Sequence, residues 1–258
     1  MRQHKKPGKK GCRSTLLRAA AALLALLVWQ AAALFVGEQL LLASPLSVVG
    51  RLVSLLTDGN FLAALGFTFL RIAAGYGGAF LCGVLLGALA GRFPMVETLL
   101  FPYMITIRSV PVASFVVVAL IWLSSAELSA FVSFLIVLPL IYNGVLTGVR
   151  GADPKMLEMA AVFRVPLWRR VRCIWLPALR PHLGSAAGVA IGLAWKSGVA
   201  AELIGIPRGS VGEYLYESKV YLDTATLFAV TVVIVLASTL CEKGLAFLFR
   251  RAGKEKTA

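Results

Sequence analysis

The sequence is poor in charge, and above all in acidic charge. Only 15% of the 258 residues are charged, and 12 Asp and Glu stand against 26 Lys and Arg. Hydrophobic residues make up 59% of the chain, and the mean hydropathy is +0.84. A soluble globular domain averages about 25% charged residues. The composition therefore excludes an ordinary soluble domain and is typical of an integral membrane protein.

Residues that commonly carry catalysis or bind metals are also scarce. The chain has two histidines and four cysteines, and the cysteines are too scattered for a metal site or a disulfide framework. The P-loop pattern G-x-x-x-x-G-K-[ST] is absent, as are H-E-x-x-H and G-x-S-x-G. We therefore expect no active site, no metal and no cofactor bound by this chain.

Long apolar runs dominate what is present. A bilayer core needs roughly 20 mainly apolar residues per helical span, which predicts an all-α polytopic membrane protein. The first run is longer than the roughly 7–15 apolar residues of a signal peptide, so we interpret it as a retained span. The six expected spans are Leu16–Val36, Ile72–Gly91, Ile105–Leu123, Leu128–Val149, Gly184–Ile206 and Thr226–Phe249.

The basic residues predict the orientation of these spans. They gather in an N-terminal arm (1–15), a loop (150–181) and a C-terminal tail (250–258), which flank a transmembrane region over 16–249. Six spans place all three segments on one side, and the positive-inside rule makes that side the cytoplasm. Membrane orientation thus accounts for the net charge of +14, and no nucleic-acid partner is expected.

The 150–181 loop carries more structure than a linker. Asp153 and Pro154 predict an N-cap and the first helical residue of a short helix. Pro166 opens a second helix in the same way, and Pro177 and Pro181 are expected to mark the entry to the next span. The pattern alone is compatible with docking to a cytoplasmic partner or with lying on lipid headgroups.

A resemblance favours the docking interpretation. "EMA" at 158–160, followed by "IWLP" at 174–177, resembles the EAA loop of ATP-binding cassette (ABC) importer permeases, with the same spacing from Glu158 to Pro177. Met159 replaces the usual alanine. Arg164 replaces the usual glycine, which would permit a left-handed turn, so the geometry of the turn is left open.

The resemblance extends from about 44 to 244, through "SPLSVVGRLVSL", "TFLRIAAGYGGAFLCGVLLGALAG" and "GLAWKSGVAAELIG". It is closest to permeases for nitrate, sulfonates and taurine, with thiamine-precursor permeases as an alternative. It implies a type I importer fold in the cell (inner) membrane, a homodimer, a partner ATPase that binds ATP, an extracytoplasmic solute-binding protein, and a small anionic solute. The alternative from another class is a stand-alone secondary transporter.

The resemblance also implies roles for individual residues. The resemblance implies that the ATPase contacts the residues at the positions of the EAA pattern and the arginines beside them: Glu158, Ala160, Ala161 and Pro177, flanked by Arg164, Arg169, Arg170 and Arg172. Lys196 and Ser197 are candidates to line the translocation path. Lys196 could instead pair with an acidic residue or extend to an interface, and for Arg71 and Arg108 such extension is the favoured interpretation.

Small residues recur every four positions in the second predicted span, at Gly75, Ala79, Gly83, Gly87 and Gly91. A stripe of this kind lets another helix approach closely. We expect it to serve helix packing rather than to line the path of a solute.

Overall fold

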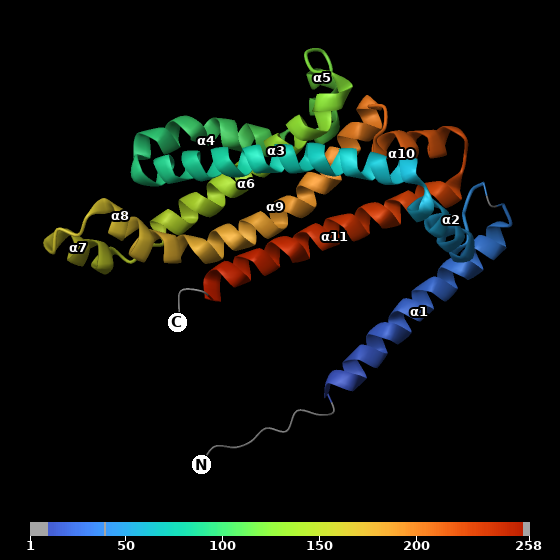
Figure 1. The fold of residues 1–258 in the computed structure, drawn as a ribbon, viewed down its shortest axis with the longest axis horizontal. Coiled ribbons are helices and arrows are strands. Elements are labelled where there is room, and N and C mark those ends of the chain that lie inside the picture. Colours follow the sequence, from blue (N-terminus) through green and yellow to red (C-terminus); the bar gives the residue numbers. More distant parts are fainter. Residues whose placement is uncertain (1–9, 39, 255–258) are drawn as a thin grey trace.

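The computed structural model describes residues 10–38 and 40–254, and within these ranges every regular element is a helix (Figure 1). The helices are α1 (Lys10–Val36), α2 (Pro45–Thr57), α3 (Gly59–Arg92), α4 (Pro94–Ser109), α5 (Val112–Ala119), α6 (Ser125–Arg150), α7 (Pro154–Val162), α8 (Leu167–Arg170), the π-helical segment η1 (Val171–Trp175), α9 (Leu176–Gly205), α10 (Val211–Val220) and α11 (Thr224–Lys254).

The core is built on α3, α6 and α9, with α6 in the middle. Glycines on α3 face α6 so closely that a larger residue would collide. A Cβ added to Gly83 would lie 2.9 Å from Cβ of Ile141, and one added to Gly87 would lie 2.7 Å from Cβ of Val145. Gly75 and Gly91 face α6 in the same way. The absence of side chains at these positions therefore sets the distance between the two helices.

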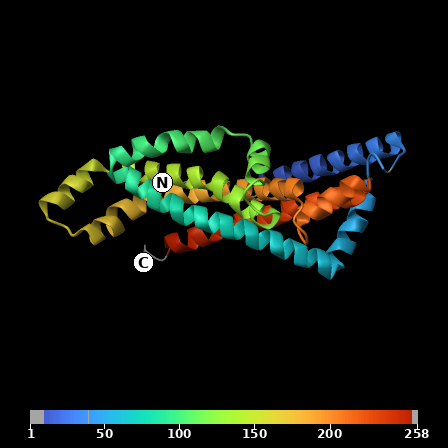
Figure 2. The same ribbon diagram turned by 90° about the horizontal axis from the view of Figure 1, so that it is seen from above.

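The same contacts show that α3 and α6 run parallel, because the residues of α6 that meet Gly83, Gly87 and Gly91 also increase in number: Ile141, Val145 and Val149. The chain must therefore return between them, and α4 runs back beside α3 (Figure 2). The predicted span Ile105–Leu123 falls on the end of this return and is interrupted there, because α4 ends at Ser109 and α5 leaves it at an angle of 101°.

Proline chemistry accounts for this break. Pro111 adopts an extended backbone (φ −59°, ψ 132°) and has no amide hydrogen for the helix ladder, so α5 starts afresh after it. Four helices of the described residues are long and apolar enough to cross a membrane, and the bent pair α4 and α5 brings the number to five if the two helices together form one span.

The first predicted span, Leu16–Val36, belongs to α1. The side chains of Leu16, Arg18 and Ala19 lie outside the described set, and the apolar part that is described, Ala20–Val36, has 17 residues. The helix as a whole has 27 residues, leans away from the bundle (Figure 1), and contacts α2 and, through Trp29, the ring of Phe228 in α11. The second predicted span is also longer than expected, since α3 begins at Gly59 rather than near Ile72.

The molecule has two distinct ends. The loop end carries α7 and α8 together with the last turns of α3, α6 and α11, and the far end carries α2, α5 and α10 (Figures 1 and 2). The sequence predicts that the second loop helix ends before the next span. In the structure it joins that span instead. Pro177 lies in the first turn of α9 and Pro181 lies inside it, and helix continues from α8 through η1 to Gly205.

Candidate functional site

The first candidate site is the loop between α6 and α9. Asp153 caps α7 as predicted: its side chain accepts a hydrogen bond from the amide of Lys155 at 2.9 Å, and Pro154 occupies the first turn. Glu158 and Ala161 lie exposed on this helix, whereas Ala160 is buried. Only part of the EAA segment is therefore accessible to another protein.

The turn after α7 is left-handed although it contains no glycine. Arg164 adopts φ +48°, and the amide of Val165 donates to the carbonyl of Ala160 at 2.9 Å. This backbone is the one that a glycine would adopt at a helix C-terminus. The turn therefore keeps the conformation of the family's glycine although Arg164 replaces that residue. The side chain of Arg164 makes this left-handed backbone sterically strained.

One arginine of the loop differs from the others. Arg170 donates from Nε to the carbonyl of Val165 at 2.7 Å and from Nη2 to that of Ala160 at 3.0 Å, so it satisfies carbonyl groups at the end of α7. Arg169 and Arg172 are exposed. The structure thus gives Arg170 a role inside the loop and leaves its two neighbours accessible to a partner.

Large apolar side chains are exposed in the same loop. Phe163 and Trp168, on either side of the turn, are 75% and 73% exposed, and Met159, Val162 and Leu167 are also exposed. Large apolar side chains exposed together with charged ones are typical of a protein contact site. Pro177, the last residue of the EAA pattern, is exposed at the start of α9.

The second candidate site is a groove between α9 and α11 with a volume of about 620 Å³. Lys196 is exposed on α9 and lines this groove, opposite Glu242 and Lys243 of α11. Ser197 is turned into the protein instead, since it is buried and its hydroxyl donates to the carbonyl of Leu193 at 2.7 Å. The two path candidates therefore lie on different faces of α9.

Glu242 is a residue that the sequence analysis missed. Its carboxylate packs against Gly192, where a Cβ would collide with Oε1. An ionisable residue inside a span is by default a candidate for function. Glu242 lies inside the predicted span Thr226–Phe249, so the sequence alone could have identified it. Glu242 and Lys196 line the same groove.

A third polar group lies buried near the far end. Glu202 of α9 is fully buried, and its Oε2 accepts from the hydroxyl of Thr68 at 2.8 Å and from the amide of Gly212 at 3.4 Å. Arg71 Nη1 lies 3.8 Å from Oε1 of Glu202. Extension of Arg71 to the membrane interface is therefore wrong: its side chain is 20% exposed and faces a buried carboxylate.

This cluster connects three helices. Thr68 donates to Glu202 and accepts from the amide of Val211 at 3.1 Å, so α3 and α9 together hold the N-terminus of α10. Backbone amides at a helix N-terminus favour a negative charge.

In the described part of the chain, no three His, Cys, Asp or Glu residues are placed to hold a metal ion.

Comparison with known proteins now decides the family. Residues 83–252 match the model of the family described as "Binding-protein-dependent transport system inner membrane component". The chain belongs to this family of ABC importer permeases. The match begins within α3 and includes the loop, the groove and the buried carboxylate.

Individual permeases are similar over nearly the whole chain. The chain is 27% identical to a Bacillus subtilis permease named for aliphatic sulfonates (96% of this chain, 90% of the relative) and 27% identical to the taurine transport permease of Escherichia coli (86% and 83%). It is 26% identical to a nitrate import permease of Synechocystis (90% and 88%). The protein is therefore a multi-pass membrane component of a binding-protein-dependent transport system.

Proposed function

We propose that this permease forms half of a translocation pathway, paired with a second copy of itself. A cytoplasmic ATPase subunit docks on each 150–181 loop and supplies all ATP hydrolysis. A solute-binding protein delivers solute at the far end. Membership of a binding-protein-dependent family supports this arrangement.

The observation that carries the proposal is the exposed surface of the loop. Glu158, Arg169 and Arg172 are accessible charges beside the apolar side chains of Phe163 and Trp168. Nothing in the described chain covers them, and such a surface is stabilised when it is buried against a partner. ATP shifts the conformation of the permease only insofar as the ATPase binds its inward-open and outward-open states differently.

The distribution of basic residues supports a cytoplasmic location for the loop end. The 150–181 loop and the basic ends of α1 and α11 lie on the side that the positive-inside rule assigns to the cytoplasm. Both termini are then cytoplasmic. Arg150, at the end of α6, forms an ion pair with Glu97 of α4 at the same end.

We propose a small anionic solute. The names of three relatives refer to aliphatic sulfonates, nitrate and bicarbonate, and two lysines line the groove against one glutamate. A cation beside the path lowers the free energy of an anion that has left its hydration shell. A thiamine precursor is the alternative within the same family.

The loop is tested by Glu158→Arg in the assembled transporter. Reversing a charge in the contact is expected to reduce co-purification of the ATPase and uptake by at least about tenfold, because losing a buried charge pair at an interface costs about 2–5 kcal/mol. Glu217→Arg, at an exposed glutamate of α10, is the control and keeps the ATPase bound. Wild-type co-purification and uptake with Glu158→Arg would contradict the docking assignment.

The groove is tested by Lys196→Met, with uptake of labelled nitrate, taurine, an alkanesulfonate, bicarbonate and a thiamine precursor measured in parallel. We expect a loss of uptake for whichever compound the wild type imports, with the ATPase still bound. Lys196→Arg, which keeps the positive charge in the groove, is the matched control. Unchanged uptake in Lys196→Met removes Lys196 from the path and leaves the loop assignment intact.

A stand-alone secondary transporter is the alternative from another class. It predicts uptake by proteoliposomes that contain this chain alone. The proposed importer predicts no uptake until the ATPase, ATP and the binding protein are added.

A further inference from the structure

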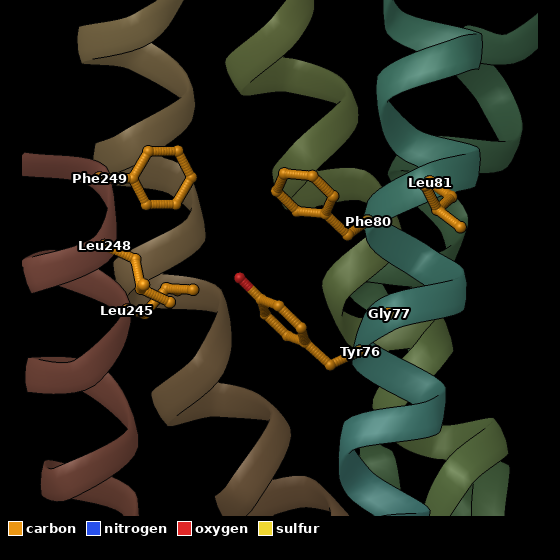
Figure 3. Close-up of a pocket in the computed structure, with 7 residues that line it drawn as sticks. All are labelled: Tyr76, Gly77, Phe80, Leu81, Leu245, Leu248 and Phe249. Carbon is orange, nitrogen blue, oxygen red and sulfur yellow. The ribbon is translucent and has the colours of Figure 1, made fainter. Parts of the chain in front are cut away.

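A second cavity lies on the other side of α11, between that helix and α3. It has a volume of about 490 Å³ and is shown in Figure 3. Its lining consists of Tyr76, Gly77, Phe80 and Leu81 from α3 and Leu245, Leu248 and Phe249 from α11. We call this cavity the apolar cleft.

The lining offers no polar group to a ligand. The only hydroxyl, that of Tyr76, donates to the carbonyl of Ala187 in α9 at 3.2 Å, so its proton is used within the protein. The remaining lining atoms are hydrocarbon and aromatic. A charged solute would lose its hydration in the apolar cleft without compensation, which separates this cavity from the groove that holds Lys196.

Residues at the edge of the cleft show where it opens. Leu81 and Leu248 are 66% and 62% exposed, on the outer surfaces of two membrane-spanning helices. On α11 the cleft residues Leu245 and Leu248 lie on a different face from Glu242 and Ala246, which line the groove. The cleft is therefore open toward the hydrocarbon of the bilayer.

Charge marks the loop end of the cleft. Phe249 is followed directly by Arg250 and Arg251, and Lys254 lies one turn further, before the single acidic residue Glu255. Arg251 is exposed. A cluster of basic residues just cytoplasmic of a span attracts anionic lipid headgroups, at about 1 kcal/mol per residue.

We propose that the apolar cleft binds an acyl chain of an anionic phospholipid whose headgroup phosphate is held by Arg251. A flexible chain can fill a space between large rings such as Phe80 and Phe249. A second copy of this protein fits less well, because helices that associate in membranes approach through small residues, and the cleft offers only Gly77.

Photo-crosslinking tests the proposal on the full chain in phosphatidylcholine vesicles. The probe is a phosphatidylglycerol with a diazirine in its acyl chain, compared with the same label on phosphatidylcholine. We expect labelled peptides from 76–81 and 245–249, with stronger labelling by phosphatidylglycerol. Arg251→Glu is expected to abolish this preference.

Gly77→Phe fills the cleft, because a Cβ at Gly77 meets no atom within 4 Å. Gly66→Phe is the matched control, since Gly66 lies on the same helix with the same free space. We expect labelling to fall about tenfold in Gly77→Phe, the change produced when roughly two methylene groups lose their burial, and to persist in Gly66→Phe. Leu248→Trp, which narrows the mouth from α11, gives an independent test if Gly77→Phe does not fold.

Each other outcome overturns the proposal. Equal labelling of Gly77→Phe and Gly66→Phe means that the cleft holds no chain. Equal labelling by the two lipids, unaffected by Arg251→Glu, removes the anionic headgroup. Crosslinks between the cleft and another copy of the chain assign it to a protein interface.

Discussion

The two ends of the molecule use the same kinds of residue in opposite ways. At the loop end, Glu158 and Arg169 are exposed, and neither forms an ion pair within the part of the chain that the structure describes. At the far end, Glu202 and Arg71 are buried and face each other. Exposed charges are available to a partner, whereas buried charges fix the geometry of their own chain.

The difference separates what a substitution should damage. A change at the far end should reduce the stability of the permease, because it leaves a charge without its counterpart inside the protein. Replacing an exposed charge at the loop end should leave the fold intact and affect what binds there, whereas Arg164 and Arg170 act on the stability of the loop itself. The following predictions test this distinction, from the largest expected effect to the smallest.

Arg71→Met is expected to destabilise the permease by about 3 kcal/mol, because it leaves the buried carboxylate of Glu202 without a counter-charge. The double variant Arg71→Met, Glu202→Gln should recover most of the loss, since the glutamine carries no charge. Thermal unfolding in detergent measures both. A double variant no more stable than Arg71→Met would show that the ion pair is not the cause.

Arg170→Met is expected to loosen the loop by about 1–2 kcal/mol, because two carbonyl groups lose a charged hydrogen-bond donor. Arg169→Met is the control, since Arg169 is exposed. Hydrogen exchange of residues 154–170 should increase only in Arg170→Met. Equal exchange in the two variants would remove the distinction between the internal and the accessible arginines.

Arg164→Gly is expected to stabilise the loop by up to about 1 kcal/mol, because glycine adopts φ +48° without the steric cost of a side chain. The gain is reduced by the greater freedom of glycine in the unfolded chain. Arg164→Val should have the opposite effect. Increased hydrogen exchange around the turn in Arg164→Gly would contradict the left-handed geometry.

Asp223→Asn is expected to have the smallest effect, about 0.5 kcal/mol, because the aspartate side chain is 43% exposed. Burial alone would raise the pKa of Asp223, but hydrogen bonds from Thr226 and the nearby Arg51 guanidinium outweigh it and lower the pKa. The stabilisation is therefore complete above the ordinary aspartate pKa of about 3.9 and is lost as the pH falls through the lowered value.

The pH dependence of unfolding provides the measurement. The stability difference between wild type and Asp223→Asn should be present at about pH 7 and vanish in strong acid, below the ordinary aspartate pKa of about 3.9. A difference that persists in acid would point to packing at the α2–α11 contact rather than to charge.

Local signals in the sequence predicted local structure well. Asp153 and Pro154 begin α7 as their capping chemistry requires, and an apolar run long enough to span a bilayer predicts each of the long helices. Pro111 also lies at a real break, but a proline does not specify the direction in which the next helix leaves. The bend of 101° depends on how α5 packs against α6 and α9.

Contacts between distant segments could not be predicted. Thr68 and Glu202 are 134 positions apart, so no periodicity places them together. Glu202 lay at the predicted end of a span, where exposure is the ordinary expectation. The groove depends in the same way on how Glu242 of α11 meets Gly192 of α9, although an intramembrane glutamate is itself visible in the sequence.

Because α8, η1 and α9 form one continuous helical segment, a tilt at the loop is transmitted along the whole segment. From Leu167 to Gly205 it is 39 residues long, or about 58 Å at 1.5 Å per residue, and Lys196 lies far along it from the loop. A tilt of about 5° at the loop would displace the far part of such an arm by roughly 4 Å, given a length set by that rise. The π-helical turn at Val171–Trp175 is the point about which we expect such a tilt, because its backbone hydrogen bonds differ from those of the α-helix on either side.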